Sequence, residues 1–368
     1  MTPPVPHVLH VFATFAAGGP QVRTTRLMDA LGRDYRHSVL AMDGVTTAAA
    51  ILPDAIDVDV LPSFPRAGGW TTARRVRALV RELRPDLVCT YNWGSIEAVW
   101  GALAAGARVV HHEDGFLPDE LAGFKRRRVW TRRWTLPRVS GVVVPSHTLA
   151  NIAREHWCLP QDKLHLIPNG LRLEAFPLAD GNPDLRAELG LTPDTFVVGA
   201  VGHLRPEKNP ARLVRAVARM ETPAHLVLVG DGPERDAVLA AAREGGIVDR
   251  LHLAGHRTET QPWYALMDAF GISSDTEQMP VALLEAMASG LPVASTDVGD
   301  VAAMLGDEAA RVGVVPLTGE TDAALAQALD RLGKDRTAAL ALGRAGRDRV
   351  ERDYTFERMV AAYRERYD

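Results

Sequence analysis

Short apolar runs alternate with amphipathic segments along the first half of the chain. The apolar runs have the length and the β-branched residues of buried strands, whereas the segments between them repeat their apolar positions at helical spacing. The predicted strands span residues 7–12, 38–42, 56–61, 87–91, 108–112, 142–144 and 164–167, and the predicted helices span residues 21–31, 71–83 and 95–105. Strands that alternate with helices predict right-handed βαβ units and a parallel sheet.

A second series of strands and helices follows a turn-rich segment between residues 177 and 193. Its predicted strands span residues 196–201, 225–229, 251–253, 270–273 and 292–294, and its predicted helices span residues 210–220, 234–244 and 280–289. A chain of 368 residues exceeds the ~250 to 300 residues at which single cores stop growing. We therefore expect an α/β protein of two doubly wound, Rossmann-like domains, residues 1–175 and 176–349, with a final helical segment at 350–368.

Two glutamates of the second series are placed where ligands bind. Glu277 lies in the loop after a predicted strand, and Glu285 lies in the helix that Pro280 opens. Open α/β sheets bind ligands beyond the carboxyl ends of their strands. Glu285 falls within the apolar run 281–287, where an unpaired carboxylate is costly, so it needs a ligand or a buried donor.

The same helix has the features of a nucleotide site. A carboxylate can accept two hydrogen bonds from the vicinal diol of a ribose. The positive end of the helix, at Met279, Pro280 and Val281, favours a nearby diphosphate.

Glu277 and Glu285 are separated by seven residues and are followed by Ala286-Met287-Ala288-Ser289-Gly290. This pattern resembles the signature of the retaining glycosyltransferases of family four. The resemblance covers almost the whole chain and is best from about residue 141 to 300. It implies a GT-B fold, in which two domains face a cleft and the last helix crosses back to the first domain. It also implies that Glu277 contacts hydroxyls of the donor sugar and that Glu285 holds the ribose.

The loop after the first strand of the second domain resembles the diphosphate loop of that family. Lys208 matches the lysine of the family, and His203 stands where the family usually has an arginine. Arg205, two residues later, is an alternative for the arginine role. Fixed cations at this place neutralise a leaving diphosphate without a metal ion.

The first domain offers candidate residues for the other side of the reaction. Gly18 and Gly19 precede a helix where the family has its glycine-rich loop, and glycines allow a ligand to approach the backbone closely. The family histidine that touches the donor sugar corresponds to Asp114, with His112 two residues earlier. Asp114 either receives a proton from the acceptor or caps its own turn.

Neither candidate metal motif in the first domain favours a metal site. Residues 111–114 are polar, but successive side chains of a strand point to opposite faces and cannot all bind one ion. Asp57-Val58-Asp59 is similar to a metal-binding motif of another fold, yet it fits a strand with Val58 and Val60 pointing inward. No cofactor is expected besides the donor substrate.

The basic charge of the chain is concentrated in its first part. Residues 1–170 carry 20 basic and 15 acidic side chains, whereas residues 171–368 carry 22 and 31. The segment 125–134 combines basic residues with Trp130 and Trp134, which suits an anionic membrane surface or a polyanionic acceptor. The alternative is a solvated basic helix whose tryptophans pack inward. No nucleic-acid-binding module is recognisable.

The sequence favours a cytoplasmic protein, free or at the inner face of the membrane. The N-terminus lacks the charged start of a signal peptide. No apolar run reaches the roughly 18 to 20 residues that cross a bilayer. The two cysteines, Cys89 and Cys158, are too few for a disulfide framework.

Together these features predict a retaining, metal-independent glycosyltransferase of the hexosyltransferase type. It would move a sugar from a nucleotide-diphosphate sugar to a sugar, glycolipid or polysaccharide acceptor. Two alternatives remain at this point. A nucleotide-sugar epimerase would use residues 111–114 as acid and base, and a non-catalytic nucleotide-sugar-binding protein would explain the missing arginine at His203.

Overall fold

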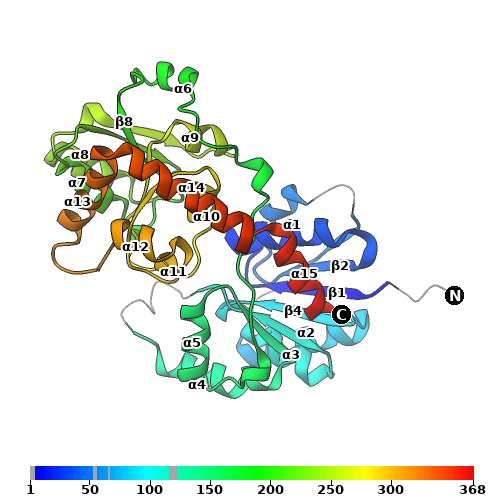
Figure 1. Cartoon of the computed structure of the whole chain (residues 1–368). Helices are drawn as coiled ribbons and strands as arrows, with labels where there is room; N and C mark the ends of the chain where they lie inside the picture. Colours follow the sequence, from blue (N-terminus) through cyan, green and yellow to red (C-terminus); the bar gives the residue numbers. More distant parts are fainter. Residues whose placement is uncertain (1–4, 53–55, 65–66, 116–122) are drawn as a thin grey trace. The chain divides into compact units, whose positions relative to one another are not determined.

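The computed structural model describes residues 5–52, 56–64, 67–115 and 123–368. The chain forms two compact units (Figure 1). The first contains the residues up to Asn169 together with Met359–Asp368, and the second contains Gly170–Arg358.

Each unit is built on a parallel sheet with its own strand order. In the first unit the order is β3-β2-β1-β4-β5-β6-β7, and in the second it is β10-β9-β8-β11-β12-β13. Every strand pair within these two sheets is parallel. The strands of the first sheet are β1 His7–Phe12, β2 Arg36–Ala41, β3 Val58–Leu61, β4 Leu87–Tyr91, β5 Val109–His112, β6 Gly141–Val144 and β7 Leu164–Leu166. Those of the second are β8 Phe196–Val201, β9 Ala224–Val229, β10 Leu251–Gly255, β11 Ala269–Ile272, β12 Val293–Thr296 and β13 Val314–Val315.

Helices connect the strands and cover the sheets. The first unit contains α1 Gly19–Leu31, α2 Gly69–Leu83, α3 Ile96–Ala105, α4 Arg126–Thr135 and α5 His147–Glu155. The second contains α6 Pro183–Glu188, α7 Pro210–Ala218, α8 Arg235–Glu244, α9 Gln261–Leu266, α10 Val281–Ala288, α11 Val301–Leu305, α12 Asp307–Gly313, α13 Thr321–Lys334 and α14 Arg336–Asp353. The last helix, α15, spans Phe356–Tyr367.

The second sheet is buried on both faces. Val197 and Val227 belong to one apolar cluster, whereas their neighbours Val198 and Leu226 belong to another. Because successive side chains of a strand point to opposite faces, the two clusters lie on opposite sides of the sheet. Continuous apolar strands are typical of such doubly covered parallel sheets, and the predicted Rossmann-like architecture is confirmed.

One detail of the strand prediction is wrong. Val60 of β3 is 37% exposed instead of pointing into the core. β3 is the edge strand of the first sheet, paired only with β2, so fewer neighbours cover its faces.

The helix α15 joins the first unit through its second half. Arg108 donates hydrogen bonds to the carbonyl oxygens of Tyr367 at 2.8 Å and Arg366 at 2.7 Å. Arg364 forms an ion pair with Asp34 at 2.7 Å. The predicted return of the last helix to the first domain is thus present in the grouping of Met359–Asp368.

A buried histidine pair lies beside α15. His10 Nδ1 is 2.7 Å from the Tyr91 hydroxyl, and His10 Nε2 is 3.1 Å from Nδ1 of His37. The ring of Tyr367 packs 6.4 Å from that of His10. Burial, and secondarily the neighbouring His7, lower the pKa of His37 to about 4, and burial also lowers the pKa of His10. Both imidazoles are therefore neutral in the folded protein at pH 7.

The free energy of unfolding of the first unit is expected to decrease as the pH falls below neutral. The pKa of His37 is about 4 in the folded protein and about 6.5 in the unfolded chain. The contribution of the neutral His37 to the free energy of unfolding is therefore fully present above pH ~6.5 and is lost as the pH falls toward ~4. At pH 5 the loss is about 2 kcal/mol. The free energy of unfolding, measured by denaturation at pH 7.5 and pH 5, should show this loss in the native protein. The difference between the two pH values should be smaller in H37Q. An equal pH dependence in both proteins would contradict the assignment.

Candidate functional site

Three loops of the second unit follow the carboxyl ends of adjacent strands. After β8 the chain forms a short 3₁₀ helix, Pro206–Lys208, and then enters α7. Residues 273–280 connect β11 to α10, and residues 297–300 connect β12 to α11. Because β8, β11 and β12 are neighbours in a parallel sheet, these loops meet at one edge.

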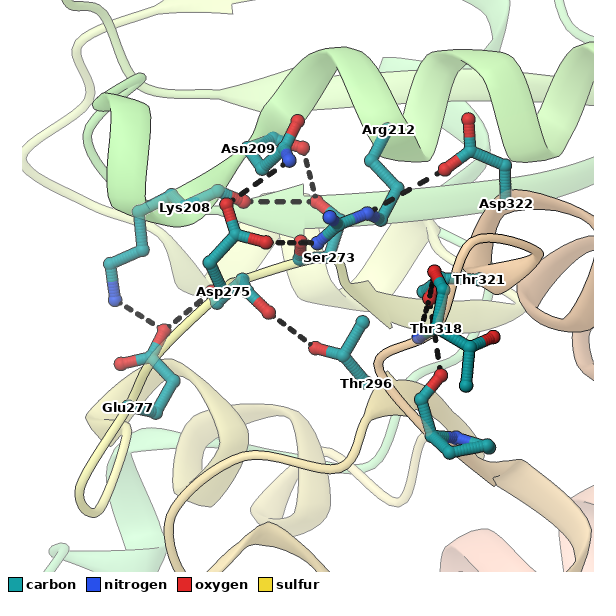
Figure 2. Close-up of polar contacts among 12 residues, drawn as sticks. Lys208, Asn209, Arg212, Ser273, Asp275, Glu277, Thr296, Thr318, Thr321 and Asp322 are labelled. Atoms are coloured by element: carbon teal, nitrogen blue, oxygen red, sulfur yellow. Dashed lines mark hydrogen bonds and ion pairs between the residues drawn. The ribbon is translucent and has the colours of Figure 1, made fainter. Parts of the chain in front are cut away.

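Lys208 lies in the loop after β8 and Glu277 in the loop after β11, and their side chains point toward each other (Figure 2). Lys208 Nζ is 2.5 Å from Glu277 Oε1, which also accepts a hydrogen bond from Ser274 Oγ at 2.7 Å. The Glu277 side chain is 10% exposed and that of Lys208 is 37% exposed. The geometry leaves the cation accessible to an anionic ligand while the carboxylate is held by two donors. The structure thus brings these two predicted residues together.

Side chains that the motifs did not indicate hold these loops in place (Figure 2). Arg212 Nη1 donates to the Ser273 carbonyl at 2.8 Å and pairs with Asp275 Oδ1 at 2.6 Å. Ser273 Oγ donates to the carbonyl oxygens of Lys208 at 3.1 Å and Asn209 at 2.9 Å. The segments that carry Lys208 and Glu277 are therefore bonded to each other independently of the ion pair between those two residues.

The turn after β12 holds the Glu277 loop from another side. Asp300 N donates to the Gln278 carbonyl at 2.9 Å. Gly299 has a φ of +55°, and a Cβ atom there would lie 2.5 Å from the Glu277 carbonyl oxygen and 2.6 Å from that of Gln278. Only glycine combines this backbone conformation with so close an approach.

Glu285 has the buried donor that its apolar surroundings require. Tyr264 of α9 is fully buried and donates its hydroxyl to Glu285 Oε2 at 2.8 Å. Burial, and secondarily the charge of Glu285, raise the pKa of Tyr264 well above its usual value. The phenol thus stays protonated and orients the carboxylate. Tyr264 carries no motif, so sequence reasoning missed it.

Replacing Tyr264 with Phe is expected to weaken binding of the predicted nucleotide-sugar donor about five- to tenfold, the equivalent of the roughly 1 kcal/mol that one typical hydrogen bond contributes. The reason is that Glu285 loses the donor that fixes its orientation. The measurement is the Kd of the nucleotide sugar, with Y354F as a control tyrosine elsewhere in the second unit. Equal affinities in Y264F and the native protein would show that the contact does not orient the site.

The start of α10 lies between these glutamates. Met279 is buried, Pro280 is the N-terminal cap residue, and Val281 is the first helical residue and is 36% exposed. The first amide groups of a helix have no partner within it and are available to anions. The predicted diphosphate contact at these residues stays a prediction.

His203 and Arg205 are both exposed, but they have different neighbours. His203 Nδ1 lies 3.3 Å from the Asp231 carbonyl, and its ring stacks 6.5 Å from that of His256. Arg205 Nη1 lies 3.9 Å from Glu207 Oε1. His203 therefore belongs to the cluster of turns after β8, β9 and β10, whereas Arg205 contacts its own turn. Neither contact tests which residue takes the arginine role.

Gly18 and Gly19 lie at the start of α1. Gly18 is the cap residue in an extended conformation, and Gly19 is the first helical residue. Within the part of the chain that the structure describes, a Cβ atom on Gly19 would meet no atom within 4 Å. Local packing therefore does not require a glycine at this position, and the predicted ligand contact stays a prediction.

Asp114 follows β5 and is paired with a cation. Arg23 of α1 forms a two-pronged ion pair with Asp114 and also donates to Asn169 Oδ1 at 3.1 Å. The Asp114 amide donates to Asn92 Oδ1 at 2.7 Å. The side chains of Arg23 and Asp114 are each 12% exposed. Asp114 is thus an oriented carboxylate that still has some access to solvent.

His112 is enclosed by aromatic rings. It is 1% exposed and stacks between Tyr91 at 4.6 Å and Tyr363 at 5.8 Å. Burial, followed by the charge of Arg23, lowers its pKa well below the usual value. His112 is therefore neutral, and Asp114 is the more accessible of the two candidates for the family histidine role.

Next to Asp114 lies a buried ionic cluster that sequence reasoning did not resolve. Glu113 is fully buried and pairs with Arg132 of α4 at 2.5 Å, and His111 Nε2 lies 3.5 Å from Glu113 Oε2. The Arg132 guanidinium lies 5.1 Å and 5.0 Å from the ring centroids of Trp93 and Trp157. Burial alone would raise the pKa of Glu113, but Arg132 and His111 lower it overall.

The outer face of α4 is basic and aromatic. Trp130 is 58% exposed and Trp134 is 67% exposed, so the alternative with tryptophans packed inward is wrong. Arg126, Arg127 and Arg133 are exposed on the same helix.

None of the helices described is both long and apolar enough to cross a bilayer. Among the described residues, no group of His, Cys, Asp or Glu side chains is arranged to hold a metal ion.

Two family models match the chain. A model of the glycosyl transferase 4-like domain matches residues 18–170, and a model of glycosyl transferases group 1 matches residues 195–335.

Individual proteins are similar to the chain over most of its length. The chain is 31% identical over 308 residues to EpsF of Bacillus subtilis, a glycosyltransferase by name, with 79% of each chain covered. It is 26% identical over 296 residues to LpsD of Rhizobium meliloti, a lipopolysaccharide core biosynthesis glycosyltransferase, covering 80% of this chain and 78% of that one. The structure of Anabaena HepE in complex with UDP and glucose superposes with a TM-score of 0.84 at 19% identity, covering 98% of each chain.

Proposed function

The chain belongs to the group 1 glycosyltransferases, and we propose that it transfers a hexose from a nucleotide-diphosphate sugar with retention of configuration and without a metal ion. The observation that carries the proposal is the pairing of Lys208 with Glu277 at the carboxyl edge of the second sheet. The loop that carries Glu277 leads directly into α10, the helix that contains Glu285.

Each residue has a distinct role in this proposal. Lys208 supplies the positive charge that offsets the charge of the departing diphosphate. Glu277 accepts hydrogen bonds from donor-sugar hydroxyls, and Glu285, oriented by Tyr264, holds the ribose. The diphosphate oxygen that leaves the sugar takes the acceptor proton on the same face, which accounts for retention without a protein nucleophile.

The ion pair between Lys208 and Glu277 also indicates how the donor is received. Glu277 keeps its bond from Ser274 Oγ at 2.7 Å when Lys208 turns toward the diphosphate. A donor therefore exchanges one ion pair for another and leaves the carboxylate oriented. Such preorganisation reduces the reorganisation needed during the reaction.

The experiment that tests this function is a panel of nucleotide sugars, measured for binding and slow hydrolysis in the presence of a chelator. Native protein, E285Q and K208A are compared. One donor should bind and be hydrolysed by the native protein, with both variants impaired. Binding without turnover under any acceptor would support the non-catalytic alternative, and activity that requires added metal would overturn the metal-independent mechanism.

The epimerase alternative receives less support from the site. It requires an acid and a base from residues 111–114, yet Glu113 is tied to Arg132 and Asp114 to Arg23. The two histidines of this segment are fully enclosed. An epimerase would release an epimerised sugar nucleotide in the absence of acceptor, which the same assay detects.

The acceptor is proposed to be a glycolipid or a polysaccharide assembled at the cytoplasmic face of a membrane. The exposed Trp130 and Trp134, flanked by arginines on α4, combine the apolar and cationic groups that bind anionic lipid surfaces. The similarity to a lipopolysaccharide core glycosyltransferase agrees with such an acceptor. No nucleic-acid partner is proposed.

Sedimentation with lipid vesicles tests the membrane contact. The native protein is expected to bind vesicles that contain anionic lipid and to be released by salt, because each basic residue contributes about 1 kcal/mol near such a surface. The variant W130S/W134S should bind at least tenfold more weakly, whereas W70S, which changes another exposed tryptophan, serves as the control. Equal binding of both variants would exclude α4 as the contact.

A further inference from the structure

A cavity of about 660 Å³ lies in the second unit, away from the loops described above. Its inner wall includes Phe196 at the start of β8, Met267 just before β11 and Leu291 just before β12. Lys208 and Glu277 follow the carboxyl ends of β8 and β11, so the cavity lies at the opposite, amino edge of the same sheet. Its volume is within the range of small-molecule sites.

Two exposed aliphatic side chains lie at the mouth of the cavity. Leu178 is 51% exposed and Leu340 is 54% exposed, and both line the cavity. Large aliphatic side chains at the rim of an apolar cavity gain from contact with an apolar ligand, because the contact removes their surface from water.

Two arginines of α14 flank Leu340 on the same helical face. Arg336, Leu340 and Arg344 are spaced four residues apart and all line the cavity. Arg336 donates to the Asp194 carbonyl at 2.9 Å, which engages one of its five N–H groups, and Arg344 is exposed. The cavity thus offers guanidinium donors next to apolar surface.

A buried donor completes the wall. Arg186 is 6% exposed and pairs with Asp268 at 2.8 Å, which neutralises its charge. Its Nε has no hydrogen-bond partner within the part of the chain that the structure describes. A buried N–H without a partner is unusual in folded proteins, and Arg186 places this one in the wall of the cavity. Because Asp268 neutralises Arg186, the remaining charged residues of the lining are Arg336, Arg344 and the exposed Asp180. The lining therefore has a net positive charge.

We propose that this cavity is a second ligand site, distinct from the nucleotide-sugar site, for an amphipathic monoanion with an apolar body and one acidic group, such as a medium-chain carboxylate. The apolar body lies against Phe196, Met267 and Leu291, and the acidic group lies between the guanidinium groups at the mouth. This binding involves no chemical step and does not depend on the proposed transferase activity.

The test uses 8-anilinonaphthalene-1-sulfonate, an aromatic monoanion that fluoresces in apolar sites, with the full-length protein. Binding should be saturable with one site, and decanoate should displace the probe whereas 1-decanol at the same concentration should displace it much less. R344Q should weaken binding about tenfold, as expected for a lost charge-assisted hydrogen bond. A187W, which places a bulky side chain on an exposed lining position of α6, should abolish it.

Controls separate this site from the donor site. R352Q removes an exposed arginine of the same helix that pairs with Asp353 and should bind the probe normally. Excess UDP should not displace the probe, and A187W should hydrolyse the nucleotide sugar as the native protein does. Displacement by UDP, or normal probe binding by both R344Q and A187W, would overturn the proposal even if the transferase function holds.

Discussion

Replacing Lys208 with Ala is expected to slow sugar transfer by about 10²- to 10³-fold, the effect of removing one fixed donor that stabilises developing charge. In the proposed reaction the diphosphate gains charge as it leaves the sugar, and Lys208 places a cation beside Glu277 at this edge. The rate constant for transfer, or for donor hydrolysis, should fall more than donor affinity does, because the charge is greatest in the transition state.

Two further variants make this result interpretable. K334A removes a lysine that forms an exposed ion pair with Glu221 on another surface of the second unit, and it should keep native activity. K208R retains the charge and should recover part of the rate. If K208A transfers sugar at the native rate, the diphosphate is stabilised elsewhere and the role of the loop after β8 has to be reassigned.

The second large effect is expected at Arg132, where substitution by Met should destabilise the protein by about 3–5 kcal/mol. The substitution leaves Glu113 fully buried without its cation. Denaturant unfolding followed by circular dichroism measures the change. The loss should shrink as the pH falls, because R132M lacks the cation that lowers the pKa of Glu113, so that protonation of the buried carboxylate removes its unpaired charge in the variant before it disrupts the ion pair of the native protein.

The origin of this loss can be separated from simple loss of packing. The double variant R132M/E113L removes both charges and should be more stable than R132M alone, since apolar pairs often replace buried ion pairs without cost. R127M, on the exposed face of the same helix, should change the stability by less than about 0.5 kcal/mol. A double variant that is no more stable than R132M would contradict the ion-pair explanation.

The features predicted best from the sequence are those encoded by short, local patterns. The buried strands appear as continuous apolar runs, and β8 is found at residues 196–201 as predicted. Lys208 and Glu277 were identified because they stand in recognisable loops, and the structure places them 2.5 Å apart. The charge and spacing of Glu285 within an apolar helix correctly indicated a buried partner.

Other parts of the site depend on contacts between segments that are distant in sequence. Tyr264 is 21 residues from Glu285 and carries no motif, and Arg212 reaches Ser273 across 61 residues. The sequence of helix α4 is equally compatible with inward and outward tryptophans, because Arg132 occupies the inward position that an apolar residue would normally take. Only the fold reveals that a buried carboxylate, Glu113, requires a cation there.

The two faces of helix α4 carry residues with different surroundings. Its outer face carries Trp130 and Trp134, and on its inner face Arg132 is bonded to Glu113, the residue covalently adjacent to Asp114. A displacement of the helix would therefore act on an ion pair that ends one residue from Asp114. If the proposed membrane contact forms, the helix that carries it is therefore also bonded, through the Arg132 guanidinium group, to the residue next to a candidate proton acceptor.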